Sequence, residues 1–65
     1  MKVRYYPALD VVRILFRDAL IQDSYEDKPG EILDYDKEGN VVGLEVLNAS
    51  QRIENPRALD YAVTA

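Results

Sequence analysis

The chain has 65 residues, a formal net charge of −4, and neither cysteine nor histidine. These absences exclude disulfides, thiolate metal sites and histidine-dependent nucleophilic catalysis. The eight basic residues are scattered among twelve acidic ones, and no segment approaches the ~20 apolar residues of a membrane span. We therefore expect a cytoplasmic protein that binds neither nucleic acid nor membrane.

The first two predicted strands form a hairpin. Residues Lys2 to Tyr6 alternate in character, and Pro7 ends this strand because proline has no N–H to donate. A second strand, Val11 to Phe16, follows after a short break, with Val12, Ile14 and Phe16 on one face and Val11, Arg13 and Leu15 on the other. The short connection indicates antiparallel pairing.

A weaker strand is predicted next. Residues 21–27 are mostly polar, which is typical of a short edge strand whose charges discourage pairing with another chain. The sequence Asp27-Lys28-Pro29-Gly30 then predicts a turn.

Residues 30–47 predict a second hairpin around the turn Asp36-Lys37-Glu38-Gly39. The Asp36 carboxylate can accept backbone N–H groups, and Gly39 supplies the positive φ of a three-residue loop with a glycine bulge. Counting outward from this turn places Tyr35 opposite Val41 and Glu31 opposite Glu45.

This register makes both faces of the hairpin apolar. One face carries Ile32, Val42, Leu44 and Val46, and the other carries Leu33, Tyr35, Val41 and Leu47 around a gap at Gly43. We assign Asp36, Gly39 and Gly43 as structural turn residues. Two strands are marginal in water, so each face needs a cover from other strands, a helix or a second subunit.

Glu31 and Glu45 are the weak candidates for a metal site. Two facing carboxylates repel each other unless they share a proton or bind a hard cation such as Ca²⁺ or Mg²⁺. The alternative is that each pairs with an arginine, such as Arg4 or Arg13, or stays in solvent.

A short helix is predicted at about residues 55–63. Asn55 suits an N-cap, Pro56 suits the first helical position, and Leu59, Ala62 and Val63 follow helical spacing. A helix of two turns cannot persist alone, so its apolar stripe must dock on the sheet or on a partner.

The layout resembles the YuzE-like family of small bacterial proteins, also called domain of unknown function 2283. The resemblance is carried by Val3-Arg4-Tyr5, by residues 10–14, and above all by residues 29–36 and 39–50. It implies an antiparallel sheet with a terminal helix, and it brings no catalytic residues. Some family members are encoded beside small toxin-like proteins, which suggests a partner-binding role.

Together these observations predict a single α+β domain over residues 1–65. An antiparallel meander of four to five strands, about residues 2–48, would precede the C-terminal helix. We assign no catalytic residue and no cofactor. The expected function is a non-catalytic interaction module, a homodimer or an antitoxin-like regulatory partner, with a small-ligand or divalent-cation binder as the alternative. The candidate interface residues are Tyr35, Val41, Leu47, Leu59 and Tyr61.

Overall fold

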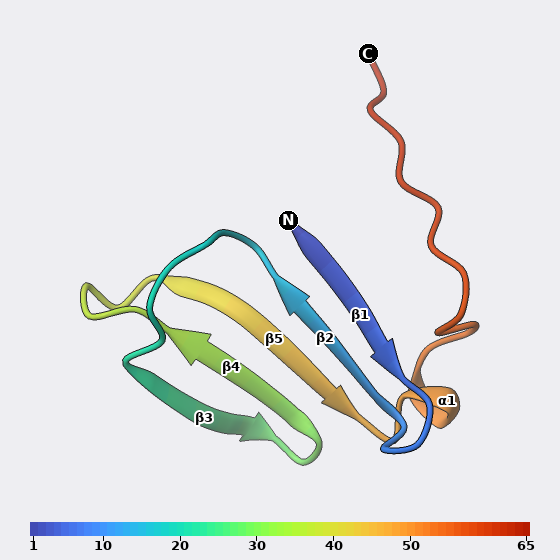
Figure 1. Ribbon diagram of the computed structural model, residues 1–65, viewed down its shortest axis with the longest axis horizontal. Helices are drawn as coiled ribbons and strands as arrows, with labels where there is room; N and C mark the ends of the chain where they lie inside the picture. Colours follow the sequence, from blue (N-terminus) through green and yellow to red (C-terminus); the bar gives the residue numbers. More distant parts are fainter.

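The computed structural model describes all residues, 1–65, and contains one five-stranded antiparallel sheet and one short helix (Figure 1). The strands are β1 (Lys2–Tyr6), β2 (Val11–Leu15), β3 (Asp23–Lys28), β4 (Glu31–Tyr35) and β5 (Val41–Leu47), and the helix is α1 (Ala49–Arg52). The predicted antiparallel sheet is confirmed, and the fold is mainly β.

The strand order is β1-β2-β5-β4-β3, so the prediction of a simple meander is wrong. β2 pairs with β5, and the segment between β2 and β3 crosses the ends of β5 and β4 (Figure 1). The polarity of the strands explains this order. β3 is exposed along its whole length and occupies an edge, whereas the apolar strands β2 and β5 gain most from central positions.

The predicted helix at residues 55–63 does not form, and the only helix is the earlier α1. Asn55 does begin a turn, because its side-chain oxygen accepts the Arg57 N–H at 3.1 Å and its carbonyl accepts the Ala58 N–H at 3.1 Å. The chain then continues without regular structure, and Leu59 is 69% exposed. The predicted apolar stripe stays exposed, and a two-turn helix without tertiary contacts does not persist, so only one turn forms.

The hairpin register departs from the prediction after one pair. Asp36 donates its N–H to the Asn40 carbonyl at 3.0 Å, and Tyr35 lies opposite Val41. The register then shifts, and Asp34 lies opposite Gly43. The extra residue in β5 is Val42, which is fully buried and whose carbonyl accepts the Phe16 N–H at 2.9 Å.

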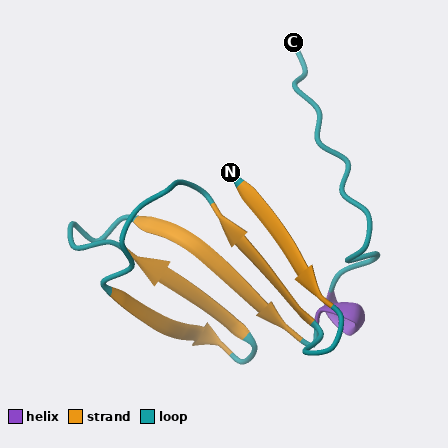
Figure 2. Cartoon of the chain, in the orientation of Figure 1, coloured by secondary structure: helices purple, strands orange, loops and turns teal.

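The molecule is a single layer. Its extents are 34 × 32 × 18 Å, and the only buried apolar residues are Val12, Val42 and Ala49. α1 lies at one end of the sheet and leaves both faces without a covering element (Figure 2). The cover that the sequence analysis requires is therefore absent within one chain.

Candidate functional site: an open apolar sheet face

Residues paired across neighbouring strands share a face of the sheet, and the observed register places most of the large apolar side chains of the strands on one face, with Asp23, Lys28 and Glu31 on its β3–β4 side. We define the apolar face by Val3, Tyr5, Val12, Ile14, Tyr25, Leu33, Tyr35, Leu44 and Val46. Its row Val3, Ile14, Leu44 and Leu33 crosses four strands, and the rings of Tyr25 and Tyr35 lie 5.8 Å apart.

The opposite face is mixed in character. We define the mixed face by Lys2, Arg4, Val11, Arg13, Leu15, Ile32, Glu45 and Leu47. The Arg13 guanidinium lies 3.6 Å from the Glu45 carboxylate. The predicted grouping of Ile32 with Leu44 is thus wrong, because the bulge at Val42 moves Ile32 to the mixed face.

The uncovered sheet leaves an unusually large surface. The chain exposes 5214 Å². A compact monomer of 7.4 kDa exposes roughly 4,200 Å², so about 1,000 Å² remains in excess. One partner of a standard protein interface buries about 800 Å². The uncovered sheet and the extended last segment both contribute, and together they offer enough area for a stable interface.

An ion pair borders the apolar face near α1. Glu31 lies on the apolar face opposite Val46, and its carboxylate pairs with the Arg52 guanidinium. Arg52 also donates to the Pro29 carbonyl at 2.9 Å. This pair joins α1 to the turn between β3 and β4 and places polar groups at the border of an apolar surface.

Asp10 holds the other side of α1. Its carboxylate accepts the Tyr5 hydroxyl at 2.9 Å, the Ser50 N–H at 2.9 Å and the Ser50 hydroxyl at 2.7 Å. The hydrogen bond from Ser50 lowers the pKa of Asp10, and the hydrogen bond to Asp10 raises the pKa of Tyr5. Asp10 thus stays ionised at neutral pH and anchors α1 to the β1–β2 turn.

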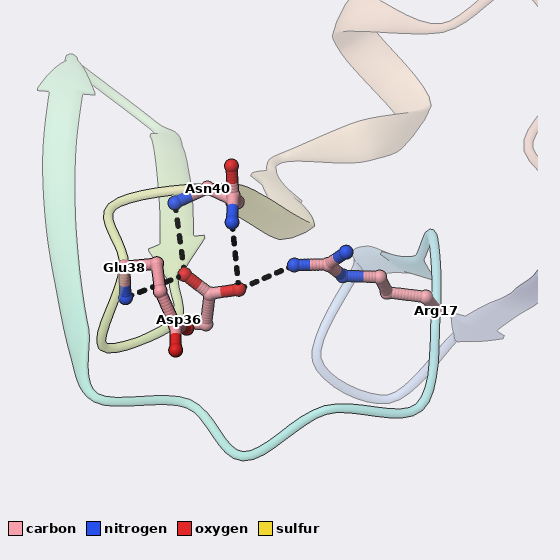
Figure 3. Close-up of polar contacts among 4 residues, drawn as sticks. All are labelled: Arg17, Asp36, Glu38 and Asn40. Carbon is pink, nitrogen blue, oxygen red and sulfur yellow. Dashed lines mark hydrogen bonds and ion pairs between the residues drawn. The ribbon is translucent and has the colours of Figure 1, made fainter.

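Asp36 organises the turn between β4 and β5 (Figure 3). Its carboxylate accepts the N–H groups of Glu38 at 3.0 Å and Asn40 at 2.9 Å, the Asn40 side-chain amide at 3.2 Å, and the Arg17 guanidinium. Burial raises the pKa of Asp36, but these hydrogen bonds outweigh it and lower that pKa below its ordinary value. The contact with Arg17 also fixes the segment that connects β2 to β3.

The two candidate metal ligands are separated by the sheet. Glu31 lies on the apolar face and Glu45 on the mixed face, and each pairs with a different arginine. The prediction that they stand opposite each other is wrong, because the bulge at Val42 shifts the register by one residue. No group of three acidic side chains gathers elsewhere. The geometry therefore gives a shared cation site no support.

The predicted interface residues fall into three places. Tyr35 and Val41 lie opposite each other beside the turn between β4 and β5. Leu47 lies on the mixed face opposite Val11. Leu59 and Tyr61 belong to the last segment and are 69% and 70% exposed. Tyr35 thus belongs to the apolar face, and Val41 shares that face because it pairs with Tyr35. Gly43 lies within β5 and not in a turn.

A groove runs between β1 and the last segment. It is lined by Met1, Val3, Leu59 and Tyr61. Nearby, the Arg57 guanidinium lies 5.6 Å from the centre of the Tyr5 ring. The sequence did not indicate Met1 and Val3 as groove residues, or Asp10 and Arg52 as residues that hold α1 in place. The only sequence pattern that pointed to this groove was the alternation of Leu59, Tyr61 and Val63 in the last segment.

A family model described as "Protein of unknown function (DUF2283)" matches residues 2–50. This range includes all five strands and the start of α1. Searches of curated proteins and of solved structures each found no match. The only helix has four residues and is far too short to cross a membrane.

Proposed function

Because the chain belongs to the DUF2283 family of proteins of unknown function, we propose its function from its surface: it is a non-catalytic self-association module. In this proposal the apolar face of one chain packs on the apolar face of a second copy, forming a homodimer. The observation that carries the proposal is the open apolar face, which joins aliphatic and tyrosine side chains from all five strands.

Self-packing of this face follows the physics of β-sandwiches. Two sheets that meet face to face place their inner side chains in a shared core about 10 Å thick. The row Val3, Ile14, Leu44 and Leu33 would lie in such a core, with Glu31 and Arg52 at its border. A soluble monomer rarely keeps so large an apolar patch exposed.

The mixed face is less suited to this role. Arg4, Arg13 and Glu45 would have to lose water on association, and desolvating such charges offsets much of what burial contributes. Arg13 and Glu45 also already form an ion pair with each other within one chain. The difference between the faces therefore favours a two-layer dimer over a longer stack.

Sedimentation velocity at tens of micromolar tests the proposal. We expect the wild-type chain to sediment as a dimer and Ile14→Lys, which places a charge at the centre of the apolar face, to sediment as a monomer. Leu20→Lys is the matched control, because Leu20 is 92% exposed and lies between β2 and β3. Tyr25→Lys, at a position 59% exposed, provides a variant less disturbing to the fold.

A wild-type chain that stays monomeric at these concentrations contradicts the proposal. Equal association by wild-type, Ile14→Lys and Tyr25→Lys chains contradicts the choice of face.

The proposal extends to a bacterial, cytoplasmic setting and to an antitoxin-like regulatory partner, both of which rest on family resemblance. A partner protein would compete with the second copy for the apolar face. Co-expression with the product of the neighbouring gene, followed by co-purification of wild-type and Ile14→Lys chains, tests this extension. Capture by the wild type and loss in the variant are expected.

A further inference from the structure

The segment after α1 has the pattern of a strand. Leu59, Tyr61 and Val63 alternate with Ala58, Asp60 and Ala62, and the three large side chains are 69%, 70% and 85% exposed. The segment adopts no helix and runs away from α1 (Figure 1). Its period of two matches the periodicity of a strand with one apolar face. We call residues 57–63 the arm.

The sheet offers one edge that can accept the arm. The β3 edge is protected, because Asp23, Glu26, Asp27 and Lys28 are all exposed and the pairing with β4 is irregular near Lys28. The β1 edge pairs only with β2, so one side of its backbone lacks a strand partner. β1 is regular, and the only charged residues it exposes are the cations Lys2 and Arg4.

The arm and β1 already lie along each other in antiparallel order. Arg57 lies over the ring of Tyr5, and further along Leu59 and Tyr61 face Val3 and Met1 across the groove. No backbone hydrogen bond joins the arm to β1 within the chain. The contact in one chain is therefore between side chains only, and the groove between the two segments is open.

The charges of the arm and of β1 are complementary in an antiparallel ladder. With Leu59 opposite Val3, Asp60 lies opposite Lys2; with Tyr61 opposite Val3, Asp60 lies opposite Arg4. In both registers the large arm side chains extend the apolar face, and Asp60 joins the mixed face. Pairing of β1 with another β1 would instead bring Lys2 and Arg4 close to their own copies.

From this placement we propose that the two copies of the dimer exchange arms, so that residues 57–63 of each chain add a sixth strand to the β1 edge of the other. The inference rests on the proposed homodimer and names the segment that completes it. The exchanged strand satisfies the free edge of β1 and extends the shared core with Leu59 and Tyr61. It also removes the exposed apolar side chains of the arm from water.

Engineered cysteines test arm exchange directly, because the full chain contains no cysteine of its own. Val3→Cys protein is mixed with Leu59→Cys or Tyr61→Cys protein at ~10 µM and oxidised, and covalent dimers are measured on a non-reducing gel. Leu20→Cys mixed with Leu59→Cys measures random collision. We expect about a hundredfold more covalent dimer than in the control, since neighbouring residues in a complex have effective concentrations near the millimolar range.

The double variant Val3→Cys/Leu59→Cys separates the two ways in which the arm can pair. Arm exchange predicts a covalent dimer, whereas an internal disulfide in a monomer overturns it. Cross-linking no faster than in the collision control also overturns arm exchange. If arm exchange fails but the chain still sediments as a dimer, the proposed homodimer stands. If the chain is monomeric, both the homodimer and arm exchange are contradicted.

Discussion

Single aspartates fix two of the three tight turns that connect the strands, between β1 and β2 and between β4 and β5. Asp10 takes a positive φ of 54° and ties Tyr5 to Ser50, and Asp36 receives the N–H groups of its own turn together with Arg17. Carboxylates suit these positions because they accept several hydrogen bonds at once and tolerate tight backbone geometry. Neither residue is available as a free ligand for a cation, since each is already hydrogen-bonded within the chain.

The lowered pKa of Asp36 makes part of the stability depend on pH. Its pKa in the folded chain lies below the ordinary value of 3.8, so ionised Asp36 stabilises the fold above pH 3.8, and this contribution is lost as pH falls through the folded pKa. We expect Asp36→Asn to be less stable than wild type at pH 7, with a difference that shrinks below pH 3.8.

Urea unfolding from pH 7 to pH 3, at one protein concentration, measures this difference. The pKa of Asp10 is also lowered, but its contribution is common to both proteins and cancels in the comparison. A difference that stays constant down to pH 3 contradicts the role assigned to the Asp36 carboxylate.

Among the elements, β5 determines how the faces are composed. It contains the extra residue Val42, and directly after it Gly43 lies under the buried Asp34 side chain. One Asp34 oxygen accepts the Ser24 hydroxyl at 2.6 Å. The glycine is needed for close approach rather than for a turn, because a Cβ there would lie 2.8 Å from the other Asp34 oxygen.

Gly43→Ala is therefore expected to destabilise the chain by about 1–3 kcal/mol, the usual cost of overpacking. The new methyl group would also lie 3.1 Å from the Ile14 carbonyl oxygen, which belongs to the backbone and cannot swing aside. Gly39→Asn is the control, because Gly39 has free space around it and asparagine tolerates its φ of 85°.

Urea unfolding at pH 7 compares the two glycine variants. A Gly43→Ala protein as stable as Gly39→Asn would show that Asp34 moves away freely.

At the scale of the whole molecule, the chain resembles half of a two-layer fold. Its composition is 48% hydrophobic, yet only three apolar residues are buried. With so small a core, we expect the chain to depend on the proposed association to offset the entropy of folding.

Stability should consequently depend on protein concentration. For a chain that folds as a dimer, a tenfold increase in concentration raises the apparent free energy of unfolding by about 1.4 kcal/mol. Urea midpoints measured at ~2, 20 and 200 µM chain test this expectation, with Leu20→Lys as the control that should shift as the wild type does. A wild-type midpoint independent of concentration would argue against coupled folding and association.

The sequence alone predicted the positions of the strands and of the turn at Asp36. Alternation from Lys2 to Tyr6 and turn chemistry at Gly39 are local properties, since they follow from side-chain size, polarity and backbone freedom within a few residues. The family relationship could also be read from the sequence, because it lies in the same segments. For the candidate site, the sequence indicated that the second hairpin has apolar faces and that other strands, a helix or a second subunit must cover them.

Only the tertiary structure decided which side chains share those faces. The pairing of β2 with β5, the bulge at Val42 and the separation of Glu31 from Glu45 depend on contacts between residues distant in the chain. The same holds for residues 55–63, whose helical and strand patterns coexist in the sequence. Local propensity is too weak to choose between them, and residues 59–63 stay exposed instead of packing on the sheet, so no tertiary contact stabilises the helix.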